Sequence, residues 1–109
     1  MLLACNQSPA PLTNREQLER LRTYACYRLG IDVTIRSRIA SVIAARTAFI
    51  LVARERGFTQ SELGRFRGLN HSTVCIAEKN MREALTMPAF YKDYINNYNT
   101  LQQWKNSSN

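Results

Sequence analysis

The polar residues 71–73 directly follow Asn70 and directly precede an apolar run that begins at Val74. Asn is a favoured N-cap, because its side chain accepts a hydrogen bond from a free amide of the first helical turn. A helix that begins here presents the side chains of His71, Ser72 and Thr73, together with free backbone amides, at its positive end. These groups are suited to hydrogen bonding with a base edge or a phosphate oxygen.

A second helix is predicted just before this one. Thr59-x-x-Glu62 is a capping box, in which side chain and backbone exchange hydrogen bonds at the start of a helix. We expect helices over residues 59–67 and 71–85, joined by a Gly-containing turn at 68–70. The second helix has one apolar stripe, with Glu78 and the other charged residues off it: Val74, Ala77, Met81 and Leu85. This arrangement is typical of a helix-turn-helix, which places the start of its second helix in the DNA major groove.

Positive charge is concentrated near these elements. The chain of 109 residues has 15 Lys and Arg against 8 Asp and Glu, a net charge of +7, and twelve of the basic residues are Arg. Residues 36–67 hold seven Arg and two Glu, a net charge of +5. Such a balance favours a polyanionic partner, nucleic acid first and an acidic membrane second; a merely basic surface is the alternative. The predicted phosphate contacts from this charge are Arg36, Arg38, Arg46, Arg65 and Arg67.

The rest of the chain predicts one helical domain. Thr13-x-x-Glu16 is another capping box, and it predicts a helix over about residues 14–29 that ends at Gly30. One side of this helix is apolar and holds Leu18, Leu21, Ala25 and Leu29. A turn over 31–37 is expected to end in a basic loop. The long apolar helix predicted over about residues 38–56 is expected to lie buried at the centre of the domain. Pro88 opens a last helix that extends to about residue 104. We therefore predict an all-α domain of about five helices over residues 13–104, with flexible tails at 1–12 and 105–109.

Aromatic residues recur along the last predicted helix at helical spacing. Core packing is expected for Phe90, Tyr94 and Tyr98, whereas Tyr91 or Trp104 are candidates for the surface of a weak homodimer. The same side of the helix could instead bind an acidic partner such as a replication protein, so a protein-interaction module is the alternative function.

Catalysis, metals and cofactors are not expected. His71 and Cys75 are helical neighbours, but no C-x-x-C pair or orienting carboxylate accompanies them, so neither a metal site nor a catalytic pair is predicted. Cys26 and Cys75 are expected to be small buried residues. Three cysteines without a secretory signal predict reduced thiols and a cytoplasmic, nucleoid-associated protein. The apolar run at 39–53 is too short and too polar to span a bilayer, and no small-molecule substrate is indicated.

Residues 62–74, ELGRFRGLNHSTV, resemble the signature of the C-terminal DNA-binding domain (domain IV) of the bacterial replication initiator DnaA, approximately E-I-G-x-x-F-G-G-R-D-H-[ST]-T-V. Residues 45–55 are similar to that family's [PA]-R-Q-x-A-x-x-L-A-[RK]-E helix. The resemblance covers roughly residues 20–85 and implies a Trp-repressor-like helical bundle that reads origin boxes. The chain departs from the family pattern at four positions, with Thr47 in place of Gln, Arg67 in place of Gly, Leu69 in place of Arg and Asn70 in place of Asp. The stretch at 33–38 is also several residues shorter than in the family.

The resemblance also implies roles for individual residues. The residues placed at bases and grooves are His71, Ser72, Thr73, Asn70, Arg38 and Arg46, with Arg38 as the minor-groove arginine. The residues placed at phosphates are Arg36, Thr47, Arg65 and Arg67.

The sequence has no G-x-x-x-x-G-K-[ST] phosphate loop, so no ATPase activity is expected. We predict a stand-alone domain that binds double-stranded DNA with sequence preference. Repression, competition for boxes, or marking a site on a phage or mobile element would suit such a domain, and the sequence does not choose between replication and transcription.

Overall fold

The computed structural model describes residues 13–105, and every regular element in this part of the chain is an α-helix. The predicted tail at 1–12 and residues 106–109 lie outside the described residues. The helices are α1 (Asn14–Leu29), α2 (Ala40–Glu55), α3 (Gln60–Gly64), α4 (His71–Thr86) and α5 (Lys92–Gln102). The predicted all-α fold of about five helices is confirmed.

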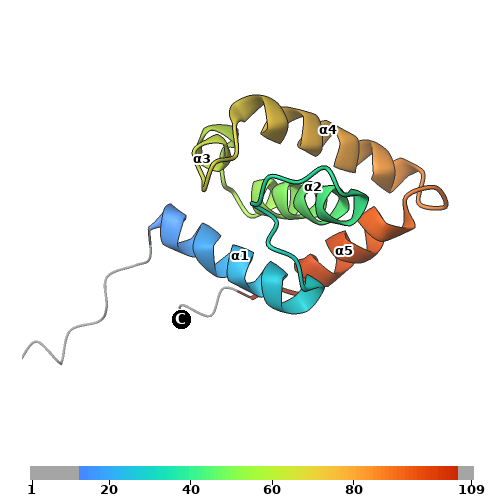
Figure 1. Ribbon diagram of the computed structural model, residues 1–109, viewed down its shortest axis with the longest axis horizontal. Coiled ribbons are helices and arrows are strands. Elements are labelled where there is room, and N and C mark those ends of the chain that lie inside the picture. Colours follow the sequence, from blue (N-terminus) through green and yellow to red (C-terminus); the bar gives the residue numbers. More distant parts are fainter. Residues whose placement is uncertain (1–12, 106–109) are drawn as a thin grey trace, which may run out of the picture.

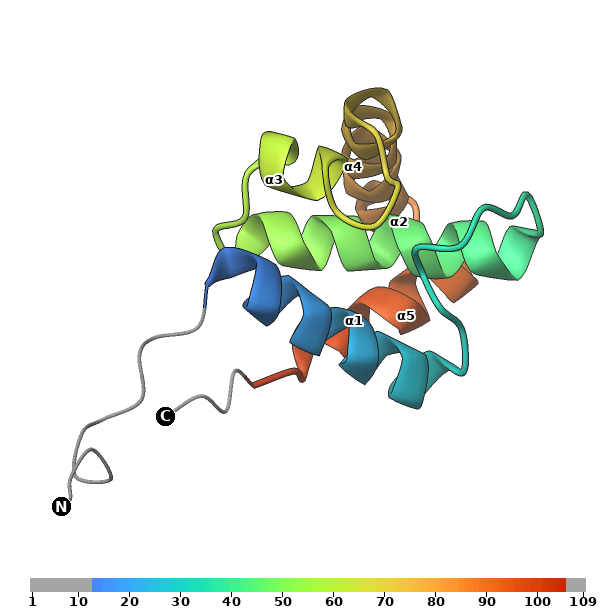
Figure 2. The same ribbon diagram turned by 60° about the vertical axis from the view of Figure 1, so that its left-hand side comes forward.

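Helix α2 lies at the centre, between α4 on one side and α1 and α5 on the other (Figure 1). Figure 2 shows α1 and α2 one above the other, with α3 and α4 across the opposite side of α2. Ten of the sixteen residues of α2 are buried, among them Phe49, Ile50 and Leu51 with no exposed surface. The prediction of a buried central helix is confirmed, since the helix is apolar nearly all round and must be covered on every side.

Local signals set the ends of α1 as predicted. The Thr13 hydroxyl accepts from the Glu16 amide and the Glu16 carboxylate accepts from the Thr13 amide, which completes the capping box. Gly30 ends the helix at φ 71°, a left-handed conformation that glycine adopts without a steric penalty. Leu18, Leu21 and Ala25 are buried as the stripe requires.

The connection between α3 and α4 is longer than predicted. Helix α3 begins at its capping box but ends at Gly64, and residues 65–70 form the connection where a turn at 68–70 was expected. The helix ends early because Phe66 turns inward to a buried position against Phe49, and Arg67 then takes a positive φ of 48°. Gly64 permits close packing of the two helices, since a Cβ there would lie 3.1 Å from the backbone nitrogen and Cα of His71.

Several predictions for the C-terminal half and α1 were wrong. Ala84 is buried in α4 in place of Leu85, which is 38% exposed. Helix α5 begins at Lys92 rather than at Pro88, and Phe90 in the intervening turn is 82% exposed instead of packed in the core. Trp104 is only 7% exposed, which removes it as a dimer surface. Tyr94 and Tyr98 do pack against the core, but Cys26 is exposed and Cys75 only half-buried.

Glu78 was placed off the apolar stripe of α4, and the structure buries it. Its carboxylate accepts hydrogen bonds from Arg54 of α2 at 2.9 Å, from Gln60 of α3 at 2.9 Å and from Arg82 at 2.9 Å. Burial alone would raise the pKa of Glu78, but these hydrogen bonds lower it to about 2. One carboxylate therefore joins three helices at the side of α4 that faces the core.

No helix within residues 13–105 combines the length and the apolar character that a bilayer-spanning segment needs.

The low pKa of Glu78 predicts a loss of stability in acid. The carboxyl has an ordinary pKa of 4.5 in the unfolded chain and about 2 in the fold, so stability is present above pH 4.5 and is lost as the pH falls toward 2. The contribution is at most roughly 3 kcal/mol. Urea unfolding followed by Trp104 fluorescence should show Glu78→Gln clearly less stable than the wild type near pH 7, with a smaller difference near pH 3. An equal difference at both pH values would contradict this role.

Candidate nucleic-acid interface

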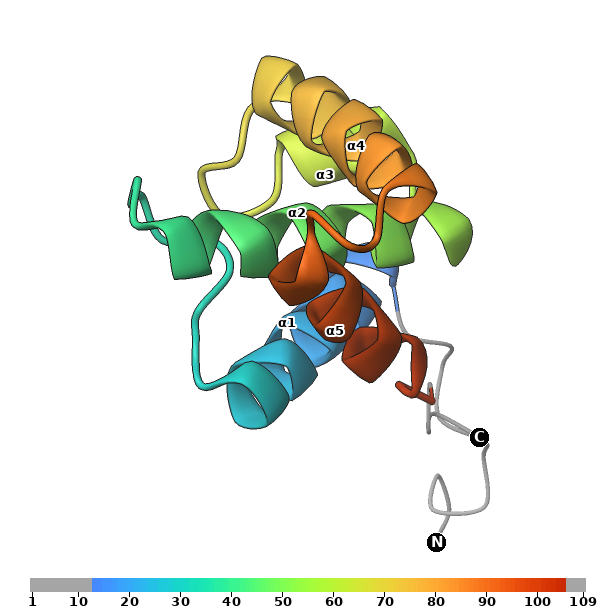
Figure 3. The same cartoon turned by 90° about the vertical axis from the view of Figure 1, so that its right-hand side faces the viewer.

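A polar groove of about 460 Å³ separates the loop after α1 from the beginning of α4. Figure 3 shows the loop at 31–39 and the connection at 65–70 on the same side of the molecule, beside the start of α2. Of the ten residues that line the groove, three are arginines and none is acidic: Thr34, Ile35, Arg36, Ser37, Arg38, Arg46, Gly68, Leu69, Asn70 and Thr73. The groove thus brings together five of the ten predicted site residues from three separate parts of the sequence.

The loop between α1 and α2 is held by specific contacts near its start. Val33 has no exposed surface, and the Asp32 carboxylate accepts from the Thr34 amide at 3.0 Å and from the Thr34 hydroxyl at 2.7 Å. Burial alone would raise the pKa of Asp32, but these bonds and the nearby Arg22 guanidinium hold it below its usual value. Asp32 is therefore an anion that is engaged with Thr34 and Arg22, and it does not line the groove.

Arg46 holds the second half of the loop. Its guanidinium extends from α2 and donates to the carbonyl oxygen of Ile35 at 3.0 Å and to that of Ser37 at 3.4 Å. The Ser37 hydroxyl in turn accepts from the Ile39 amide at 3.1 Å, just before α2 begins. Arg46 thus serves first as the support that fixes the loop against α2, while it also lines the groove.

Arg36 and Arg38 lie on this supported loop with exposed side chains. Within residues 13–105 neither makes an ion pair or a side-chain hydrogen bond, which leaves both charges without a carboxylate to neutralise them. Two uncompensated guanidinium groups on one wall of a groove make a favourable site for phosphate oxygens.

The other wall is the first turn of α4. The Asn70 side chain accepts from the Thr73 amide at 2.8 Å, so the predicted N-cap is confirmed. Asn70 and Thr73 line the groove, whereas His71 and Ser72 are exposed on the adjoining surface. The remaining free amides of this turn lie at the positive end of a sixteen-residue helix, where they favour negative charge.

Three of the predicted phosphate contacts do not line the groove. Thr47 is 4% exposed, so its hydroxyl is not offered to a phosphate at the surface. The Arg67 guanidinium pairs with Glu19 of α1 at 3.1 Å. Arg65 donates to the carbonyl oxygen of Ser61 and lies beside α1 with Leu18 and Phe66. We therefore leave Thr47 out of the proposed contacts and assign Arg65 and Arg67 to the outer surface beside α3.

His71 and Cys75 lie close together, with Nδ1 and Sγ 3.5 Å apart. Gln60 adds an oxygen 3.5 Å from the same sulfur. Among residues 13–105 no three His, Cys, Asp or Glu side chains gather in a way that could hold a metal ion. The pair therefore offers a weak polar contact that links α4 to α3.

We compared the chain with models of protein families, with curated proteins and with solved structures. None of them matches it.

Sequence reasoning did not find two contributors to the groove. Thr34 and Ser37 line it and also fix the loop that carries the arginines. The Asp32 side chain accepts from the Thr34 amide and the Ser37 side chain from the Ile39 amide, each two residues further on, which is a pattern typical of Asp and Ser in loops. This local pattern is visible in the sequence, but only the folded structure shows that Thr34 and Ser37 border the groove.

The role of Arg46 predicts that its loss loosens the loop while the fold remains. In Arg46→Ala, hydrogen exchange of the Thr34 and Ile39 amides should become about tenfold faster, because a bond from a charged group is worth on the order of 1.5 kcal/mol. Arg38→Ala removes the same charge from the groove but no support from the loop, so exchange should stay at the wild-type rate. Unchanged exchange in Arg46→Ala would contradict this role.

Proposed function

We propose that the protein binds double-stranded DNA with sequence preference through the face that contains the polar groove. The observation that carries the proposal is the position of Arg36 and Arg38 opposite the capped first turn of α4, with no carboxylate of residues 13–105 paired to either. Phosphates have two kinds of partner on this face, guanidinium groups on one wall and helix amides on the other. The net charge of +7 adds a longer-range attraction.

In this proposal the two walls have different tasks. Arg36 and Arg38 contact the sugar-phosphate backbone and set the register, with Arg38 at the minor groove, while Arg46 holds the loop in place. The first turn of α4 enters the major groove, where His71, Ser72 and Thr73 set the sequence preference. Helix α3 and its connection to α4 then act as a helix-turn-helix with a long turn. Arg65 contacts phosphates beside it, and Arg67 exchanges its ion pair with Glu19 for a phosphate contact there.

The resemblance of residues 62–74 to the DnaA signature supports the same face. It suggests a DnaA-box-like target and a role in replication or transcription, without ATPase activity. Neither catalysis nor a cofactor has a part in the proposal.

Salt-dependent binding tests the proposal. Fluorescence anisotropy of a labelled duplex with a DnaA-box-like site should show an affinity that falls steeply as salt rises, and a scrambled duplex should bind more weakly at every salt concentration. Arg38→Ala should weaken binding to both duplexes and reduce the salt slope by about one. Lys92→Ala is the matched control, since it removes one positive charge far from the groove and should leave binding nearly unchanged. An affinity for both duplexes that does not change with salt would exclude nucleic-acid binding.

Thr73→Ala separates base reading from backbone contact. The substitution should reduce the preference for the box-like duplex by about tenfold, as expected for the loss of one base contact, while binding to the scrambled duplex stays the same. Circular dichroism should show unchanged helix content, because the Asn70 cap contacts the backbone amide rather than the Thr73 side chain. A sequence preference that survives this change would mean that α4 is not the reading helix.

A further inference from the structure

An isoleucine is exposed on the outer side of α4, just beyond the turn that is proposed to read bases. Ile76 is 60% exposed, although Val74 and Ala77 beside it in the chain are buried. It lies four residues after Ser72 and three after Thr73, so the three side chains share one side of the helix. The side of α4 that the proposed function directs into the major groove therefore includes a large apolar group.

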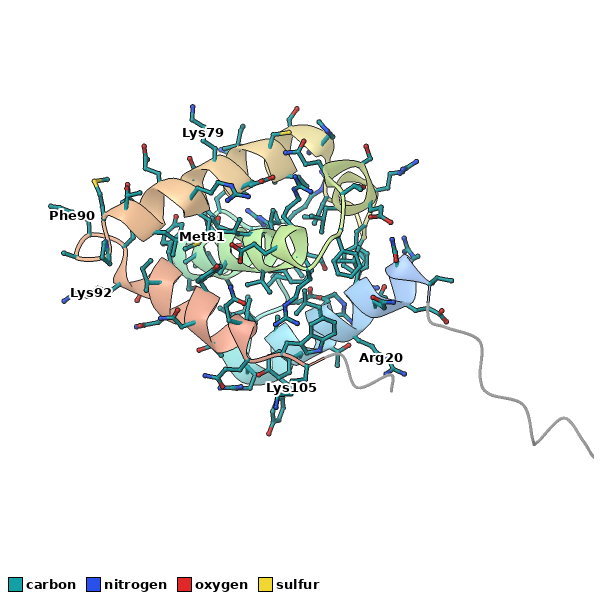
Figure 4. The ribbon with its side chains drawn as sticks, turned by 180° about the vertical axis from the view of Figure 1, so that it is seen from behind. Arg20, Lys79, Met81, Phe90, Lys92 and Lys105 are labelled. Atoms are coloured by element: carbon teal, nitrogen blue, oxygen red, sulfur yellow. The ribbon has the colours of Figure 1, made fainter. Side chains whose placement is uncertain are left out.

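The outer side of α4 has no negative charge around this isoleucine. Within residues 71–80 the single acidic residue is Glu78, and its carboxylate is buried and bonded to other side chains on the core side. Lys79 is exposed and makes no ion pair within residues 13–105. Figure 4 shows Lys79 directed away from the body of the molecule, whereas Met81 points toward α2. This part of the helix surface can thus approach DNA without repulsion from a carboxylate.

The position of Ile76 along α4 indicates a base rather than a phosphate as its partner. At 1.5 Å per residue, Ile76 lies about 8 Å along the axis from His71, within the first two turns of the helix. The major groove is about 12 Å wide and admits a helix, so both turns can lie at base edges. An isoleucine offers no donor or acceptor to a phosphate. The apolar group that base pairs present in this groove is the C5-methyl of thymine.

We propose that Ile76 reads a thymine by packing against its C5-methyl group. The inference rests on the proposed DNA binding and adds one base pair to the sequence that α4 distinguishes. The contact removes two apolar surfaces from water, which favours thymine over cytosine or uracil without a hydrogen bond. Because Ile76 is about one turn further along α4 than Ser72, the thymine belongs to a base pair next to those contacted by residues 71–73.

Deoxyuridine tests the contact, since it differs from thymidine only by the missing C5-methyl group. Each thymidine of the labelled box-like duplex is replaced in turn, and the affinity is measured by fluorescence anisotropy. At one position the wild type should lose about fourfold in affinity, as expected for one buried methyl group. Ile76→Ala should bind the two duplexes equally well at that position. Alanine is the better helix former, so the substitution should leave the helix content unchanged.

Two further variants separate the methyl contact from a general effect on α4. Ile76→Val retains the branched methyl groups at Cβ and should keep the sensitivity to deoxyuridine. Leu85→Ala is the matched control, because Leu85 is an exposed apolar residue of the same helix nine residues further on. It should respond to deoxyuridine as the wild type does.

The outcomes distinguish this inference from the proposed function. Binding in which the wild type and Ile76→Ala respond alike to deoxyuridine at every position would overturn the role of Ile76 and leave DNA binding intact. Absence of binding to any duplex would overturn both.

Discussion

The burial of α2 is the constraint on which the rest of the structure depends. A helix with ten buried residues among sixteen has no solvent face of its own, so the other helices must cover it on all sides. Two arginines of this helix, Arg46 near its middle and Arg54 in its last turn, bind its surroundings. Arg46 holds the carbonyl oxygens of the loop after α1, and Arg54 holds Glu78 of α4 together with the carbonyl oxygen of Phe58. The relative position of the loop and α4 is therefore fixed through α2, and the groove between them is a consequence of core packing.

Among the described residues, the ion pairs neutralise some arginines and leave others uncompensated. Glu19 pairs with Arg22 and Arg67, and Glu78 pairs with Arg54 and Arg82, so these carboxylates neutralise arginines of α1, α2, α4 and the connection between α3 and α4. Arg36 and Arg38 have no such partners within residues 13–105. Their electrostatic field is consequently available to a ligand, whereas that of an equal number of paired arginines is largely cancelled.

The parts of the fold that sequence reasoning predicted are those set by local chemistry. The caps at Thr13 and Thr59, the glycine stop at Gly30 and the Asn70 cap each depend on residues within one helical turn, and the structure confirms them. The wrong predictions concern residues whose environment is set by distant elements. Glu78 is buried because Arg54 and Gln60 reach it from other helices, and Phe90 is exposed because α5 begins after it. In the candidate site, the sequence predicted Asn70 and Thr73 as polar residues at the start of a helix. It did not predict that Arg46 supports the loop or that Thr47 is buried, because both depend on how the helices pack.

A titration of the isotope-labelled protein with a short DNA duplex, followed by NMR at low salt, tests the central claim most directly. Binding through the groove should shift the signals of residues 34–38 and 68–73 first and most strongly. The signals of Tyr27, Phe90 and Trp104 should stay in place. Shifts that are centred on α5, Tyr27 and Trp104, with the groove residues unaffected, would contradict the proposal that this groove is the surface that contacts DNA.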